Sequence, residues 1–197
     1  MAANFLKLAV TESVRKAQEQ YFGVSQTPAG MPERDALTEE EISFVQARDS
    51  FYMATISESG WPYIQHRGGH TGFLRALSPQ KLAFADYRGN RQMLSTGNLA
   101  ANDRVALFLM DYAQRARLKI LGHARVADAR EHPELVRQLA EPDVQRIVER
   151  LFFIDIVSFD WNCPIYITPR YTVEELQNLV APLKARIAEL EAVLKKP

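Results

Sequence analysis

The chain has 197 residues, enough for one domain with a hydrophobic core and too few for two large ones. Its 24 lysines and arginines balance 24 acidic residues, so no overall field favours nucleic acid or an anionic membrane as a partner. The apolar stretches are too short to span a bilayer, no signal peptide is recognisable, and the single Cys163 excludes an internal disulfide; we therefore expect a cytoplasmic protein without a metal site.

The first fifty residues predict a helical segment, residues 1–50. Apolar residues at helical spacing indicate one helix over 4–21, and the glycines and prolines of 23–32 then indicate a surface loop or the edge of a ligand site. Thr38, followed by three glutamates and an apolar run, is a capping box that should begin a second helix ending near Asp49.

From Phe51 the hydrophobic period changes to two, which is typical of strands. A hairpin is expected first, with strands 53–57 and 61–67 joined by a turn at Gly60. Four further strands are expected at 73–77, 81–86, 104–111 and 117–128. Six consecutive strands predict antiparallel meanders or a barrel, and a short helix over 90–101 should cover one mouth of such a barrel.

The last third of the chain returns to helix. Short helices are expected over 133–140 and 142–150, followed by a strand over 151–159 that rejoins the sheet. A capping box at Thr172 should open a C-terminal helix that runs almost to Pro197, with Pro182 kinking or dividing it. Its apolar heptad positions are Leu176, Val180, Leu183, Ile187, Leu190 and Leu194. The expected division is a helical segment over 1–50, a barrel over 51–171 and a helix over 172–197, within one domain overall.

Polar residues gather where the predicted strands end. Gln65, His66 and Arg67 close one strand, and 86–92 joins another strand to the short helix. A helix N-terminus presents unpaired N–H groups to an anion, glycine permits close approach, and arginine grips phosphate oxygens with a rigid fork. We interpret this pattern as a site for a phosphate monoester. The same residues also suit an exposed turn, and Trp161 equally suits a core anchor.

The order of these motifs resembles the pyridoxamine 5'-phosphate oxidase-like, FMN-binding split barrels, mainly over 51–126. The resemblance is carried by Gly60-Trp61-Pro62, His66-Arg67-Gly68-Gly69, Gly72-Phe73-Leu74, Asp86-Tyr87-Arg88-Gly89-Asn90, Gly97-Asn98-Leu99 and Arg117-Leu118, and more weakly by 160–164 and 169–171. It implies a six-stranded antiparallel split β-barrel that forms a homodimer with FMN at the interface, the phosphate of FMN at the turn after Tyr87 and its ring along 63–67. Arg117 and the Trp161-Asn162 pair would approach from the second subunit.

The candidate cofactor-binding residues are therefore Gln65, His66, Arg67, Asp86, Tyr87, Arg88, Asn90, Arg91, Gln92, Ser95, Asn98, Arg117, Trp161, Asn162 and Arg170. Two departures from the oxidases matter. Their Ser-Arg-Lys at the phosphate turn is replaced by Arg88-Gly89-Asn90, and their C-terminal Arg-x-His by Arg170-Tyr171-Thr172. We therefore expect an FMN-dependent oxidoreductase of unknown substrate that does not oxidise vitamin B6 phosphates. The alternatives are a non-catalytic flavin sensor and a split barrel that binds haem or F420.

Overall fold

The computed structural model describes residues 3–30 and 33–194, so positions 31–32 of the expected loop and 195–197 of the expected helix lie outside the described residues. The helices are α1 (Ala3–Ala9), α2 (Glu12–Phe22), α3 (Glu39–Gln46), α4 (Leu94–Ala101), α5 (Pro133–Leu139) and α6 (Val173–Leu194). The strands are β1 (Ser50–Ile56), β2 (Pro62–Gly68), β3 (Arg75–Ser78), β4 (Lys81–Tyr87), β5 (Arg104–Asp111), β6 (Ala116–Asp128) and β7 (Val148–Trp161).

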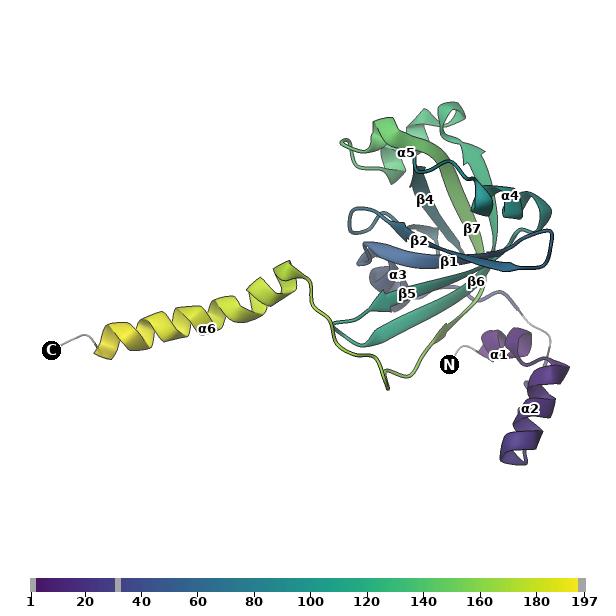
Figure 1. Cartoon of the computed structure of the whole chain (residues 1–197), viewed down its shortest axis with the longest axis horizontal. Helices are drawn as coiled ribbons and strands as arrows, with labels where there is room; N and C mark the ends of the chain where they lie inside the picture. Colours follow the sequence, from purple (N-terminus) through teal and green to yellow (C-terminus); the bar gives the residue numbers. More distant parts are fainter. Residues whose placement is uncertain (1–2, 31–32, 195–197) are drawn as a thin grey trace. The chain divides into compact units, whose positions relative to one another are not determined.

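The strands form one seven-stranded sheet in the order β2-β1-β5-β6-β7-β4-β3 within the described residues, so the prediction of six strands was wrong. The seventh member is β7, the strand expected over 151–159, which lies in the sheet between β6 and β4, as Figure 1 shows. The pairs β1–β2, β1–β5, β3–β4, β4–β7 and β6–β7 are antiparallel, as predicted. The chain thus combines an antiparallel sheet with flanking helices and a C-terminal helix.

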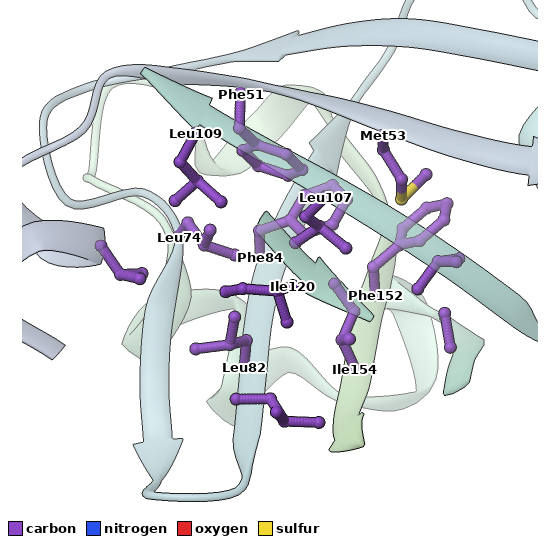
Figure 2. Packing of buried hydrophobic residues seen from close by; sticks show 14 of the residues in the cluster. Phe51, Met53, Leu74, Leu82, Phe84, Leu107, Leu109, Ile120, Phe152 and Ile154 are labelled. Atoms are coloured by element: carbon purple, nitrogen blue, oxygen red, sulfur yellow. The ribbon is translucent and has the colours of Figure 1, made fainter. Parts of the chain in front are cut away.

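The strands β4 and β7 are buried on both faces along part of their length, over 82–86 and 151–154. On one face Phe84 and Phe152 stack with ring centroids 4.8 Å apart, and they belong to the main core that also receives Phe51 and Met53 from β1. Figure 2 shows these side chains converging with those of β5. On the other face, small residues of β4 pack against Leu139 of α5 in a second cluster. Burial of both faces explains why the runs 82–85 and 151–154 are apolar without alternation.

Three helix predictions need correction. The helix expected over 4–21 is two helices, because Thr11 accepts a hydrogen bond from the backbone N–H of Val14 and caps α2. The helix expected from residue 90 begins only at Leu94. The helix expected over 142–150 is a single 3-10 turn, Gln145–Ile147, because the chain from Val148 onward pairs with β4 instead.

The capping box at Thr38 is confirmed, since Glu41 and Thr38 bond reciprocally at the start of α3. The hairpin is confirmed as well, with Gly60 at a φ of 83° in its turn, where a side chain would be strained.

The chain divides into two compact units, residues 1–110 with 117–163 and residues 111–116 with 164–197. The second unit contains α6, which is one continuous helix of 22 residues with Pro182 inside it. The prolyl residue therefore does not divide the helix. A reciprocal pair of hydrogen bonds between Thr172 and Glu175 forms the predicted capping box at its start.

Candidate functional site

Strand β2 supplies one wall of a cleft of about 240 Å³. Tyr63, Gln65 and Arg67 line the cleft because alternate residues of a strand share a face. Their cross-strand neighbours on β1 are Thr55, Met53 and Phe51, all buried. His66 lies on the opposite face, where it is exposed and packs edge-on against Tyr52 with ring centroids 5.6 Å apart.

The floor of the cleft is a carboxylate held between two guanidinium groups. Asp86, at the end of β4, is only 6% exposed and accepts a hydrogen bond from Arg67 Nη1 through Oδ1. Its Oδ2 accepts from Arg150 Nε at 2.8 Å, and Arg150 Nη2 lies 2.7 Å from the same atom. Both arginine side chains are more than four-fifths buried. Two buried cations thus share one buried anion.

The electrostatic balance of this cluster is positive. Glu149 pairs with Arg91 at 2.8 Å and with Arg150 at 3.2 Å, so three guanidinium groups face two carboxylates. Burial lowers the pKa of Arg67 below its usual range, against the opposing effect of Asp86, and nearby Arg150 lowers it further. The buried Nε of Arg67 has no hydrogen-bond partner. An anion bound in the cleft would stabilise the charged form of Arg67 and could accept a hydrogen bond from its Nε.

The aromatic core fixes the position of the Arg67 guanidinium. Its central carbon lies 5.2 Å from the ring centroid of Phe152 and 5.9 Å from that of Phe84. A planar cation over aromatic faces is stabilised by the ring quadrupole. The main core therefore presents Arg67 to the cleft as a preorganised donor.

The segment after β4 forms the rim of the cleft and holds a strained backbone. Arg91 and Met93 have φ values of 59° and 58°, a left-handed conformation that is costly for residues other than glycine. Asn90 accepts a hydrogen bond from the backbone N–H of Gln92 through its side chain. The N-cap of α4 makes no side-chain hydrogen bond, and the first turn of α4 lines the cleft. Unpaired N–H groups therefore face the same space as the arginines.

Two polar side chains attach α4 to the sheet. Ser95 Oγ donates to Gln65 Oε1 at 3.0 Å, and Asn98 Nδ2 donates to Thr55 Oγ1 at 2.9 Å. Asn98 thus holds α4 against β1, and its side chain does not line the cleft.

The structure brings eight predicted site residues together around this cleft. They are Gln65, Arg67, Asp86, Tyr87, Asn90, Arg91, Gln92 and Ser95. His66 and Arg88 instead line a neighbouring cavity of about 230 Å³, which shares Arg67, Asp86 and Tyr87 with the first. A cofactor role for any of these residues stays a prediction.

The remaining predicted residues lie elsewhere. Trp161 donates from Nε1 to Glu41 Oε1 at 2.7 Å and packs edge-on against Phe44, which fits the core-anchor alternative. The backbone N–H of Asn162 donates to the carbonyl of Arg117, and each of these side chains has a buried polar atom without a partner. Within the second unit, the guanidinium of Arg170 lies 5.0 Å from the ring centroid of Tyr112. The predicted approach of Arg117, Trp161 and Asn162 to the flavin of a second subunit stays a prediction, and so does the cofactor role of Arg170.

Sequence reasoning missed Arg150 completely. It was placed in a predicted helix, whereas the antiparallel register of β4 and β7 sets it directly opposite Asp86. The β-branched Val148, shortly before the apolar run that begins at Leu151, is a weak sequence signal that could have extended the strand to include it.

The family model described as pyridoxamine 5'-phosphate oxidase matches residues 37–150, more than half of the chain. The protein therefore belongs to this family, as predicted. No match is found among curated proteins.

Two solved structures, each with a TM-score of 0.50, are similar to this chain in fold. A "putative pyridoxamine 5'-phosphate oxidase" from Lactobacillus delbrueckii is 20% identical with a TM-score of 0.50, over 66% of this chain and 99% of that chain. A HupZ variant from Group A Streptococcus is 11% identical with a TM-score of 0.50, over 64% and 99%. An FMN-binding protein from Syntrophomonas wolfei is 10% identical with a TM-score of 0.44, over 63% and 87%.

In residues 3–30 and 33–194, no cluster of histidine, cysteine and acidic side chains has the geometry of a metal site. Over the same ranges, every helix is too short or too polar to cross a membrane.

Proposed function

We propose that the protein binds FMN in the cleft between β2 and the 86–96 segment and acts as an FMN-dependent oxidoreductase. The observation that carries the proposal is the cluster of Arg67, Asp86 and Arg150, in which two buried guanidinium groups share one carboxylate. Members of this family bind FMN, which adds independent support.

The residues present fit a phosphate monoester. Such a group carries close to two negative charges near neutral pH, and the cleft offers an excess of cationic donors together with the open N-terminus of α4. Arg91 is 63% exposed and is bonded to the carboxylate of Glu149, so it can exchange that partner for a phosphate oxygen. Asn90, on the exposed rim, adds amide donors.

Bound FMN would supply electron or hydride transfer, and the chain would hold and orient it. Tyr63 and Gln65 line the part of the cleft along β2, where the isoalloxazine ring and ribityl chain are expected. Neither the donor nor the acceptor of electrons is specified by these residues.

We further propose that two copies of the chain associate through the outer face of the β1–β2 hairpin. Exposed apolar side chains gather there, namely Tyr52, Ile56, Trp61 and Ile64, and β2 is an edge strand of the sheet. An apolar edge of this kind is typically covered by a partner.

The test compares FMN with riboflavin by fluorescence titration of the purified apoprotein. FMN should bind more tightly, and Arg91→Ala or Asn90→Ala should weaken FMN by about 1 to 3 kcal/mol while leaving riboflavin unchanged. Arg104→Ala is the matched control, because it removes an exposed guanidinium that does not line the cleft. Equal affinities for the two flavins would contradict the phosphate site.

Activity and cofactor identity need two further measurements. Reduction of the bound flavin by NADH or NADPH with multiple turnovers separates an oxidoreductase from a sensor. The absorption spectrum of the protein as purified, with mass analysis of the released cofactor, separates FMN from haem and F420.

A further inference from the structure

The helix α6 carries an apolar seam that nothing else in its own unit covers. The seam residues are Val173, Leu176, Val180, Leu183, Ile187, Leu190 and Leu194, and all are exposed. The other residues of this unit that the structure describes are the turn 111–116 and the segment 164–172, neither of which contains a helix. A seam of this length in water needs a partner surface.

The identities of the seam residues select the partner. In heptad notation, β-branched Val173, Val180 and Ile187 occupy successive a positions. Leucines 176, 183 and 190 occupy the d positions between them. β-Branched residues at a with leucine at d favour a parallel, two-stranded coiled coil over trimers and tetramers.

The flanking charges favour the same arrangement. Arg186 is at a g position and Glu191 at the following e position, so in a parallel pair the Arg186 of each copy faces the Glu191 of the other. A fully overlapping antiparallel pair would instead bring Lys184 of one chain near Lys184 of the other, and Arg186 near Arg186, so that like charges meet. Pro182 is at a c position, outside the seam, where its missing N–H does not disturb the interface.

We propose that α6 pairs with α6 of a second copy of this chain in a parallel, in-register coiled coil. The helix has 22 residues, or three heptads over about 33 Å. Three heptads form a short coil, so a second contact between the same two chains would strengthen it by raising the effective concentration. The pairing does not depend on a flavin in the cleft.

Cysteine cross-linking of the full chain tests both the partner and the orientation. In a Cys163→Ser background, Leu176→Cys should form disulfide-linked dimers under mild oxidation, because a parallel register brings the two copies of position 176 together. In the fully overlapping antiparallel pair they would be about 23 Å apart, at 1.5 Å per residue, far beyond disulfide reach. Ala185→Cys is the matched control at an outer f position and should remain unlinked.

Absence of the Leu176→Cys dimer in a protein with normal helix content overturns the proposal, whether α6 covers its own barrel or pairs antiparallel.

A second test uses the charges: Glu191→Arg should slow cross-linking at position 176, and adding Arg186→Glu should restore it. Unchanged rates in both variants would contradict the parallel register. Flavin titration of these proteins is a separate readout, so loss of FMN binding with cross-linking intact counts only against the proposed function.

Discussion

The charge balance at Asp86 depends on a single buried carboxylate. Removing its charge leaves Arg67 and Arg150 buried with a neutral amide between them, and uncompensated buried charge is among the costliest defects in a fold. Asp86→Asn should therefore destabilise the protein by about 3 to 5 kcal/mol in urea unfolding.

Inorganic phosphate should recover part of this loss, because an anion bound in the cleft replaces the missing charge. The variant should gain more stability from phosphate than the wild type does at equal ionic strength. Asp155→Asn is the control, since its pair with Lys81 is one-third exposed and worth at most about 1 kcal/mol. Equal gains for Asp86→Asn and wild type would contradict an anion site here.

Glu41 links the capping box of α3 to Trp161, and its protonation should change the free energy of unfolding. Burial raises the pKa of Glu41, but hydrogen bonds from Thr38 and Trp161 outweigh it and hold the pKa below its usual 4.5. A lowered pKa means that the ionised carboxylate stabilises the fold above about pH 4.5 and that this contribution is lost as the pH falls through the lowered value.

Glu41→Gln should thus be destabilising at pH 7, where the amide cannot accept from all of its present donors. The stability gap between variant and wild type should narrow below pH 4, as measured by urea unfolding at each pH. A gap that stays constant from pH 7 to pH 3.5 would show that the charge of Glu41 contributes nothing.

At the scale of elements, local signals predicted local structure. The capping box at Thr38 and the hairpin turn at Gly60 involve residues close in sequence, and both were predicted correctly. The cluster around Asp86 could be predicted only in part. Its rim follows β4 directly in sequence, but Arg150 reaches it through a strand register that no local pattern encodes. The left-handed turn at Arg91 delays α4 and was likewise invisible to helix periodicity.

The hydrogen bond that joins α4 to β1 gives a prediction at the scale of elements. Asn98→Ala should cost about 1 to 3 kcal/mol, because it leaves the buried hydroxyl of Thr55 without its donor. Thr55→Val in the same protein removes the unsatisfied group, so the double variant should be less destabilised than the two single losses combined. A double-mutant cycle in urea measures this coupling, and strict additivity would mean that the bond does not hold α4 on β1.

For the whole molecule, the proposed hairpin interface and the proposed coil must be tested together. In a Leu183→Lys background, which disrupts the seam, Ile64→Lys should convert the dimer to a monomer and weaken FMN binding. Light scattering gives the mass and flavin titration the affinity. Val24→Lys, a comparable charge introduced at an exposed apolar residue of the N-terminal segment, should change neither. A monomer with full FMN affinity would place the flavin site within one chain.

The last prediction concerns the reaction that gives the family its name. We expect no useful oxidation of pyridoxamine or pyridoxine 5'-phosphate by the FMN-loaded protein, because the Arg-x-His expected of oxidases is replaced by Arg170-Tyr171-Thr172. The family match covers 37–150 and so does not extend to this segment.

The physical reason is that cationic side chains bound to the phosphate of the substrate hold its reacting carbon against the flavin ring. Loss of a charged partner of this phosphate therefore lowers the turnover rate as well as the affinity for the substrate. The measurement is pyridoxal 5'-phosphate formation in air, with a genuine oxidase at the same flavin concentration as the control. Because Arg170 alone keeps one cation in this segment, Arg170→Ala is included to show whether any residual turnover depends on it. Turnover within about tenfold of the control, or about 1.4 kcal/mol in the barrier, would make vitamin B6 phosphates the substrates after all.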